Sequence, residues 1–229
     1  MKTVGIIGGL GPETTAEFYL ELIFGCYRKN KKVRPPILIW NVPIDYRIEE
    51  TFIVHAKGEE KYLPYLIEAA KKLEHAGTDF LVMPCNSMHV FIDAIRASVG
   101  IPVLSIVEET SRFLHTNQIH RVGLLATEAT VKHGLYKKVL DKQGISVAVP
   151  NGLDQARIGK LINHLVLKRG TNTDREKLMS VINDFGKQGV EDVILACTDL
   201  QLILPQHKKI RIYDTMKIFA DATVDKMTS

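Results

Sequence analysis

Short apolar runs alternate along this chain with longer runs in which apolar and polar residues are mixed. The apolar runs predict strands at residues 2–7, 37–42, 80–83 and 102–106. The mixed runs have the period of amphipathic helices and lie at residues 12–28, 59–75 and 88–98. Because these strands are apolar on both faces, the pattern predicts a parallel sheet that is covered by helices on both sides.

The second half of the chain repeats this pattern. Residues 121–126 (RVGLLA) resemble residues 3–8 (TVGIIG), and each run is followed by a turn that contains threonine. Later, GTDFLVMPCNS ends on Cys85 with two polar residues after it, and GVEDVILACTD ends on Cys197 in the same way. The repeat predicts two α/β halves, each with a cysteine at the end of a strand.

The predicted fold class is therefore α/β, with two pseudo-symmetric domains that each hold a parallel sheet flanked by helices. We predict a first half at residues 1–106 and a second half at 107–212, with the seam within residues 106–119. The last helix, within residues 213–229, has no counterpart in the repeat. We expect it to pack back onto the first half.

Composition excludes several classes of protein. The 229 residues are 45% hydrophobic and 24% charged, with a net charge of +4, as in an ordinary globular protein. The basic run at residues 28–32 fits a solvated helix end better than a nucleic-acid site. No apolar run reaches the roughly 20 residues of a membrane helix, and we expect no signal peptide. Three cysteines without a Cys-x-x-Cys pair indicate a reducing cytoplasm and no zinc site.

The two strand-end cysteines are the strongest chemical signal. Ligands of open parallel sheets bind at the carboxyl ends of the strands, where Cys85 and Cys197 are expected. If the halves face each other, the two sulfurs face one cleft from opposite sides. This arrangement suits the inversion of an α-carbon, which needs a thiolate on one face and a thiol on the other. Backbone N–H groups after each cysteine, with neutral polar neighbours, would hold a carboxylate.

Other features of the chain have simpler interpretations. A single cysteine at a strand end is usually a small buried hydrophobic residue, and the matched repeat is what favours chemistry at Cys85 and Cys197. Cys26 lies in an apolar helix and is expected in the core. The glycine-rich start at residues 8–11 lacks both the dinucleotide and the P-loop patterns, so it predicts a tight turn beside a small ligand. His89 either orients a thiolate or sits on the first turn of a helix.

Five segments together resemble the aspartate/glutamate racemase family, across essentially the whole chain. They are residues 5–15 (GIIGGLGPETT), 83–89 (MPCNSMH), 101–110 (IPVLSIVEET), 122–127 (VGLLAT) and 196–199 (ACTD). The resemblance implies an isomerase that uses neither pyridoxal phosphate nor a metal, so no cofactor, and that acts on an amino-acid substrate, often as a homodimer. It places the catalytic pair at Cys85 and Cys197. It also implies that the substrate is bound by Leu10, Asn86, Ser87, Thr127, Lys168 and Thr198.

The predicted substrate is aspartate, with glutamate or a broader range as the wider expectation. Aspartate-specific members of the family carry an arginine in the segment that corresponds to residues 45–52. Here the best register puts Glu50 or Thr51 at that position, with Arg47 nearby but offset. Lys168 is then the first candidate for a side-chain carboxylate. The alternatives are a hydantoin racemase or maleate isomerase on the same scaffold, or a two-lobed amino-acid-binding protein without turnover.

Overall fold

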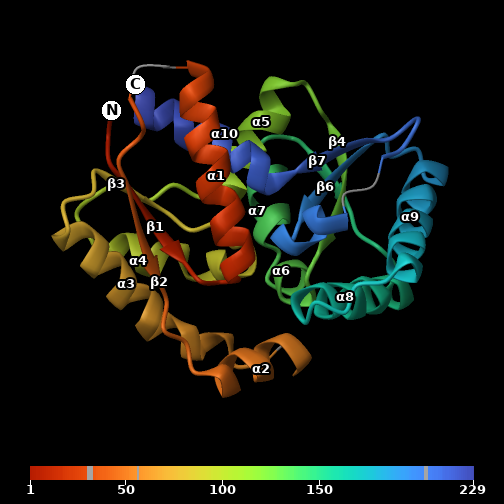
Figure 1. Ribbon diagram of the computed structural model, residues 1–229. Helices are drawn as coiled ribbons and strands as arrows, with labels where there is room; N and C mark the ends of the chain where they lie inside the picture. Colours follow the sequence, from red (N-terminus) through yellow and green to blue (C-terminus); the bar gives the residue numbers. More distant parts are fainter. Residues whose placement is uncertain (30–32, 56, 204–205) are drawn as a thin grey trace. The chain divides into compact units, whose positions relative to one another are not determined.

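The computed structural model describes residues 1–29, 33–55, 57–203 and 206–229 (Figure 1). The chain divides into two compact units, each with its own parallel sheet. Unit 1 comprises Met1–Glu109 and Met216–Ser229, and unit 2 comprises Thr110–Thr215. Whether each unit folds as an independent domain stays a prediction.

Unit 1 contains a three-stranded sheet in the order β2-β1-β3, with all pairs parallel. Its strands are β1 (Val4–Gly8), β2 (Ile37–Asn41) and β3 (Phe80–Val82). β1 and β3 are buried along their whole length, which confirms the α/β class with helices on both faces. The strand predicted at residues 102–106 is wrong: only Val103 forms a bridge, to Leu81, and Ile106 already begins a helix.

The helices of unit 1 follow the amphipathic pattern, with three corrections. They are α1 (Pro12–Lys29), α2 (Tyr46–His55), η1 (Glu59–Tyr62), α3 (Leu63–His75), η2 (Ser87–Phe91), α4 (Ile92–Ala97), the start of α5 (Ile106–Thr116) and α10 (Thr215–Thr228). The helix predicted at residues 59–75 is a 3-10 turn followed by α3, because Pro64 lies at the start of α3 and cannot donate a hydrogen bond to the preceding turn. The segment 45–52, for which no helix was predicted, is mostly α2. The seam within residues 106–119 is mostly α5. Arg28 and Lys29, the first two residues of the basic run, lie in the last turn of α1. Residues 30–32 of this run lie outside the described residues.

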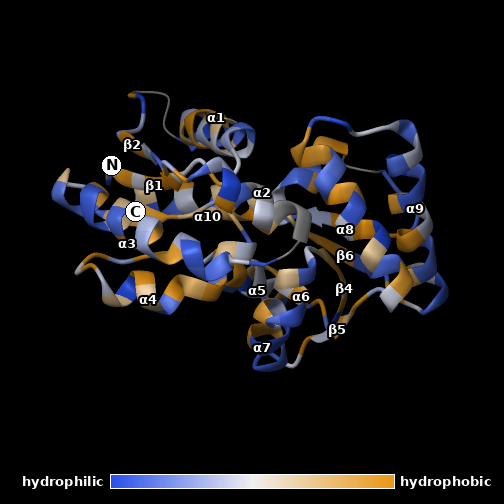
Figure 2. Ribbon diagram, turned by 90° about the horizontal axis from the view of Figure 1, so that it is seen from below, coloured by the Kyte–Doolittle hydropathy of each residue, from blue (hydrophilic) through white to orange (hydrophobic). Residues whose placement is uncertain are grey.

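Unit 2 contains a four-stranded parallel sheet in the order β5-β4-β6-β7. Its strands are β4 (Arg121–Ala126), β5 (Ser146–Ala148), β6 (Asp192–Ala196) and β7 (Arg211–Asp214). Its helices are α6 (Glu128–Lys132), α7 (Leu135–Asp141), α8 (Gly152–Val166), α9 (Asn172–Lys187) and η3 (Thr198–Ile203), with the end of α5. Figure 2 shows β4 and β6 as hydrophobic strands, with α8 and α9 mixed in hydropathy.

The two sheets repeat the same connections, as the sequence repeat requires. β1 pairs with β2 on one side and β3 on the other, and β4 pairs with β5 and β6 in the same way. β7 is an addition at the free edge of β6. The buried carboxylate of Asp192 holds β7, because it pairs with Arg211 Nε at 2.7 Å and accepts from the Tyr213 hydroxyl at 3.1 Å.

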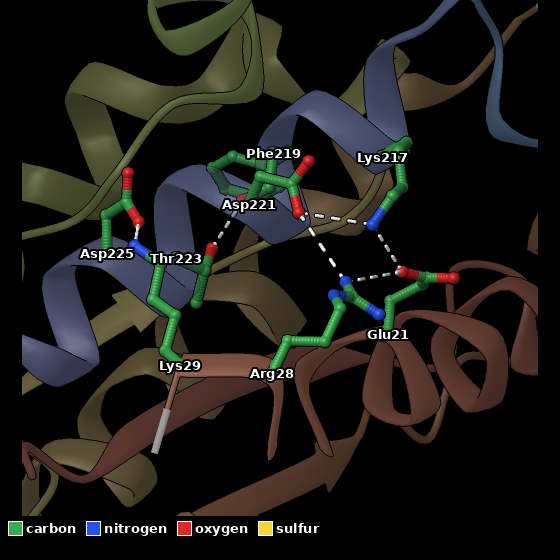
Figure 3. A network of polar contacts seen from close by, with 8 residues as sticks. All are labelled: Glu21, Arg28, Lys29, Lys217, Phe219, Asp221, Thr223 and Asp225. Carbon is green, nitrogen blue, oxygen red and sulfur yellow. Dashed lines mark hydrogen bonds and ion pairs between the residues drawn. The ribbon is translucent and has the colours of Figure 1, made fainter. Parts of the chain in front are cut away.

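The last helix, α10, packs against α1 within unit 1. Figure 3 shows the polar contacts between them: Lys217 Nζ lies 2.6 Å from Glu21 Oε2, and Lys29 pairs with Asp225. Beneath this exposed network the Phe219 ring stacks on Phe18 of α1 at 5.5 Å between centroids. None of the helices among the described residues is both long and apolar enough to cross a membrane.

Candidate active site

In unit 1 the turn after β1 is held tight by one threonine. Thr15 Oγ1 accepts from the Gly9 N–H and donates to the Gly11 carbonyl, each at 3.0 Å. Gly9 has φ +83°, and a Cβ there would lie 2.6 Å from Asn41 Oδ1, so only glycine fits. Leu10, at the tip of the turn, is half-buried against the same apolar cluster that Cys85 borders.

Cys85 lies three residues beyond β3, at the carboxyl end of the sheet. Its N–H donates to the Met83 carbonyl at 2.8 Å, which turns the chain away from the sheet. The Cys85 side chain is half-buried, Asn86 is buried, and Ser87 opens the 3-10 turn η2. The family resemblance implies four catalytic or substrate-binding residues in unit 1. Cys85, Asn86 and Ser87 share one turn, and the fourth, Leu10, borders the same apolar cluster as Cys85.

His89 supports this turn from behind. Its Nδ1 lies 2.7 Å from the Cys85 carbonyl oxygen, and its Nε2 accepts from the Ile106 N–H at 3.1 Å. The proton therefore sits on Nδ1 and the ring is neutral. Complete burial lowers the pKa of His89 to about 4. Both ring nitrogens are bound to backbone, so of the two roles left open for His89 the structure shows a helix-turn anchor rather than a partner of the thiolate.

Helix α2 and turn η1 add groups beside Cys85 that the sequence did not identify. The buried Tyr62 ring packs edge-on against Phe52 at 5.5 Å. Burial, followed by the negative charges of Glu49 and Cys85, raises the pKa of the Tyr62 hydroxyl. Burial and the charge of Glu13 raise the pKa of Glu49. The Tyr62 side chain therefore lies in the apolar cluster that Cys85 borders, and the charge of Glu49 acts on its hydroxyl.

Arg47 does not take part in this cluster. Its side chain is 89% exposed and pairs with Asp45 at 3.1 Å. Of the two residues that the register put at the family's arginine position, Thr51 donates its hydroxyl to the Arg47 carbonyl within α2. The side chain of Glu50 lies outside the described residues.

In unit 2, Cys197 follows β6 directly and is 7% exposed. Its thiol donates to Asp199 Oδ2 at 3.6 Å. The buried Thr198 opens the 3-10 turn η3. Ala126 and Ala196 are partners in the β4–β6 ladder and are the last residues of their strands, so Thr127 and Cys197 leave the sheet at the same level.

Thr127 and Lys168 are placed by different elements of unit 2. Thr127 caps α6 by accepting from the Thr130 N–H at 3.3 Å. Lys168 is exposed at the end of α8 in the left-handed conformation, with φ 55°. Leu165, one turn earlier, belongs to the apolar cluster that includes Cys197. Thr127, Cys197 and Thr198 therefore lie at the carboxyl end of one sheet, whereas Lys168 follows a helix, α8, whose Leu165 packs in the cluster that includes Cys197.

Three further titratable groups, Cys26, His164 and Asp174, have structural roles. Cys26 is fully buried, and burial raises the pKa of its thiol. His164 pairs with the buried Asp174 at 3.1 Å, and Asp174 completes a capping box with Thr171 at the start of α9. Among the described residues, no group of three or more His, Cys, Asp or Glu side chains could hold a metal ion.

Comparison with known proteins identifies the class. The model of the family described as Asp/Glu/Hydantoin racemase matches residues 7–223. The broad specificity amino-acid racemase RacX of Bacillus subtilis (strain 168) is 28% identical over 229 residues, which cover 96% of each chain. Among solved structures, a candidate Asp/Glu racemase from Yersinia pestis has a TM-score of 0.88 at 28% identity over 100% of both chains. The Picrophilus torridus aspartate racemase has a TM-score of 0.82 at 25% identity, covering 100% of this chain and 95% of its own.

The chain has two parallel sheets with matched cysteine turns, and over nearly its whole length it resembles proteins named as amino-acid racemases. These observations define an isomerase of the amino-acid racemase type. The chain belongs to the Asp/Glu/Hydantoin racemase family, which confirms the resemblance seen in its motifs.

Proposed function

We propose that the protein racemises free amino acids without a cofactor, with Cys85 and Cys197 as the two acid/base groups. The observation that carries this proposal is topological equivalence. β3 lies beside β1, β6 lies beside β4, and each of β3 and β6 runs directly into a cysteine turn followed by a 3-10 helix. A structural cysteine needs no such equivalent, whereas two-base inversion at carbon needs one proton-transfer group for each face.

In the proposed reaction one cysteine thiolate removes the α-proton and the other thiol delivers a proton to the opposite face. The two cysteines exchange roles when the other enantiomer is the substrate. General acid–base catalysis by each group contributes roughly 10²–10⁴-fold. The larger contribution comes from neutral donors that hold the carboxylate as it becomes enolate-like, and we assign this role to Asn86, Ser87, Thr127 and Thr198, with Leu10 as a backbone contact.

The proposed substrate is aspartate, with glutamate and other amino acids within a broad range, and Lys168 as the cation for a side-chain carboxylate. Support comes from the names of two relatives, one a broad specificity amino-acid racemase and one an aspartate racemase. A hydantoin racemase would instead act on hydantoins, and a maleate isomerase would act on maleate. Neither enzyme would change free amino acids. A binding protein would show affinity without turnover.

The test is ¹H NMR in D₂O with a panel of L- and D-amino acids. Loss of the α-proton signal, followed by appearance of the other enantiomer on a chiral column, supports the proposal. Proton loss should survive dialysis against a chelator and hydroxylamine. Activity that disappears on dialysis and returns with pyridoxal phosphate or a metal would refute the cofactor-independent mechanism.

We also propose that the protein is a cytoplasmic homodimer whose contact is the outer face of α1. Leu20, Phe24 and Tyr27 are 48%, 56% and 59% exposed and follow one another at helical spacing, opposite the buried face of α1. Phe24→Asp should yield a monomer by light scattering, whereas Leu153→Asp, on an exposed residue of α8, should not. All three cysteines are free thiols, which suits a reducing compartment.

A further inference from the structure

We infer that His164 and Asp174 are positioning residues for the substrate site, because the bridge between them holds the loop that presents Lys168 to a side-chain carboxylate. This inference rests on the proposed function, in which Lys168 is the cation for that carboxylate. Neither His164 nor Asp174 touches the substrate. Both act through the backbone that carries Lys168.

The position of α8 is the first step. Near the first turn of α8, the side-chain amide of Gln155 donates to the carbonyl of Ala126, the last residue of β4, at 3.0 Å. Further along, Leu165 packs in the apolar cluster that includes Cys197. The helix also contacts η3, the 3-10 turn after this cysteine, and α6, the helix that follows β4 (Figure 1). Helix α8 therefore packs at the carboxyl end of the unit 2 sheet, and the loop with Lys168 follows it.

The second step is the backbone at the end of α8. The Lys168 N–H donates to the Leu165 carbonyl at 2.9 Å, and the next N–H, that of Arg169, donates to the His164 carbonyl at 2.7 Å. This pair of bonds commonly ends a helix, with glycine favoured at the left-handed position. Helix α9 ends with the same pair and has Gly189 there, whereas α8 has Lys168 with φ 55°. A residue with a Cβ is disfavoured in this conformation, so neighbouring contacts must hold it.

The third step is the bridge that supplies those contacts. The His164 ring reaches from the last turn of α8 to α9, and its Nδ1 donates to the two oxygens of Asp174 at 3.1 and 3.2 Å. The same carboxylate accepts from the Thr171 N–H at 3.0 Å and from the Thr171 hydroxyl at 2.8 Å. The loop of residues 167–171 is therefore held at its start by the His164 carbonyl and at its end by Thr171. The bridge joins these two points.

The consequence concerns substrates with a second carboxylate. Asp174 is the fixed end of the bridge, because its side chain is 2% exposed, whereas that of His164 is 46% exposed. A lysine whose backbone is already held loses less conformational freedom when it binds a carboxylate. The affinity for aspartate should therefore depend on the bridge. Homoserine has no side-chain charge for Lys168 to meet, so its binding should not.

The experiment measures KM and kcat for aspartate and homoserine in wild type, His164→Ala, Lys168→Ala and the double variant. His164→Ala should raise the KM for aspartate about threefold, less than the roughly fivefold expected when the lysine itself is removed. The kcat and the KM for homoserine should stay the same. In the Lys168→Ala background, His164→Ala should have no further effect, because it acts through Lys168. His164→Asn should restore the wild-type KM, since its side-chain N–H can replace Nδ1.

Arg157→Ala is the matched control. Arg157 lies near the other end of α8, is 61% exposed and pairs with the buried carboxylate of Asp154 at 2.8 Å. The control thus removes a bridge of similar exposure from the same helix, away from the Lys168 loop. The KM for aspartate should match wild type. Urea unfolding shows whether each variant remains folded at the temperature of the assay.

Three results would overturn the inference: an unchanged KM for aspartate in His164→Ala, an equal rise for homoserine, or a rise that persists in the Lys168→Ala background. Calorimetric binding of aspartate to the same four proteins separates these results from the proposed reaction. Aspartate that binds without α-proton exchange would refute the proposed function, and the four dissociation constants would then decide the inference in the same way. Aspartate that does not bind at all would overturn both.

Discussion

The two cysteine turns have the same place in their sheets but different surroundings. Cys85 is half-buried and borders the apolar cluster that contains Tyr62, and a neutral histidine lies behind its backbone. Cys197 is 7% exposed, and its thiol donates to the Asp199 carboxylate at 3.6 Å. The repeat therefore sets where the sulfurs are, and the local side chains set what each sulfur does at rest.

This difference bears on the direction of proton transfer. Ionisation of Cys197 would exchange a hydrogen bond for repulsion between a thiolate and the Asp199 carboxylate. We therefore expect Cys197 to rest as the proton donor and Cys85 to act first as the base. The enantiomer whose α-proton faces Cys85 would then react from the resting enzyme, while the other enantiomer would require a prior proton shift.

The largest expected effect comes from removing either thiol. Cys85→Ser and Cys197→Ser should each lower racemisation by roughly 10²–10⁴-fold, because a serine hydroxyl is a poor base at neutral pH. One variant should still exchange the α-proton of one enantiomer in D₂O without inverting it, which shows which face each cysteine serves. Cys26→Ser is the control, since Cys26 is buried in α1 and should affect stability only. An inactive Cys26→Ser beside a fully active Cys85→Ser would show that the repeat argument is wrong.

The next effect concerns His89, a histidine that the Cys85 turn has and the Cys197 turn lacks. The pKa of His89 is about 4 in the folded protein and 6.5 when the side chain is exposed. Between these values the unfolded chain binds more protons, so the free energy of unfolding should fall by about 3 kcal/mol as the pH drops from 6.5 to 4. Above pH 6.5 this contribution is constant. Urea unfolding at several pH values measures it.

His89→Asn should flatten this pH dependence and lower stability at pH 7 by about 1–3 kcal/mol, because two buried backbone groups lose their partner. His164→Asn is a useful control, since His164 is 46% exposed and binds Asp174 in unit 2. A pH dependence that persists unchanged in His89→Asn would contradict the assignment of His89 as a buried neutral anchor.

A smaller effect is expected from Asp199, a carboxylate that the Cys197 turn has and the Cys85 turn lacks. Asp199→Asn removes the charge beside Cys197, so the thiolate of Cys197 should form more easily. For the enantiomer that Cys197 deprotonates, the acidic limb of the kcat/KM profile should move to lower pH, with a gain of about tenfold below the limb. The opposite enantiomer should keep its acidic limb, while its basic limb moves to lower pH, because Cys197 must then be protonated. A shift of both acidic limbs by the same amount would mean that Asp199 acts on the substrate or on both cysteines.

The smallest effect is expected at Lys168, an exposed residue just beyond α8. If it holds a side-chain carboxylate, Lys168→Ala should raise the KM for aspartate about fivefold, the scale of one exposed charge pair, and leave homoserine nearly unchanged. Kinetics with aspartate, glutamate and homoserine measure this. An equal loss for all three would place Lys168 at the shared α-carboxylate or in folding.

Some errors of prediction follow from contacts that lie far apart in sequence. β7 was missed because its short, half-exposed run becomes a strand only through the Asp192 contacts with Arg211 and Tyr213. Segment 45–52 has too few apolar residues to suggest a helix, yet α2 forms where Phe52 can pack on Tyr62. The role of His89 depends on Ile106, which lies 17 residues away.

The sequence by itself determined the α/β class, the internal repeat, the family and the two cysteine turns. These depend on local periodicity and short motifs, which survive in the order of the residues. Only the tertiary structure decided that His89 binds backbone, that Arg47 faces solvent, and that Phe52 of α2 packs on the cluster that Cys85 borders. The physical reason is that the sequence specifies which charges are present, but burial and distance decide which of them interact.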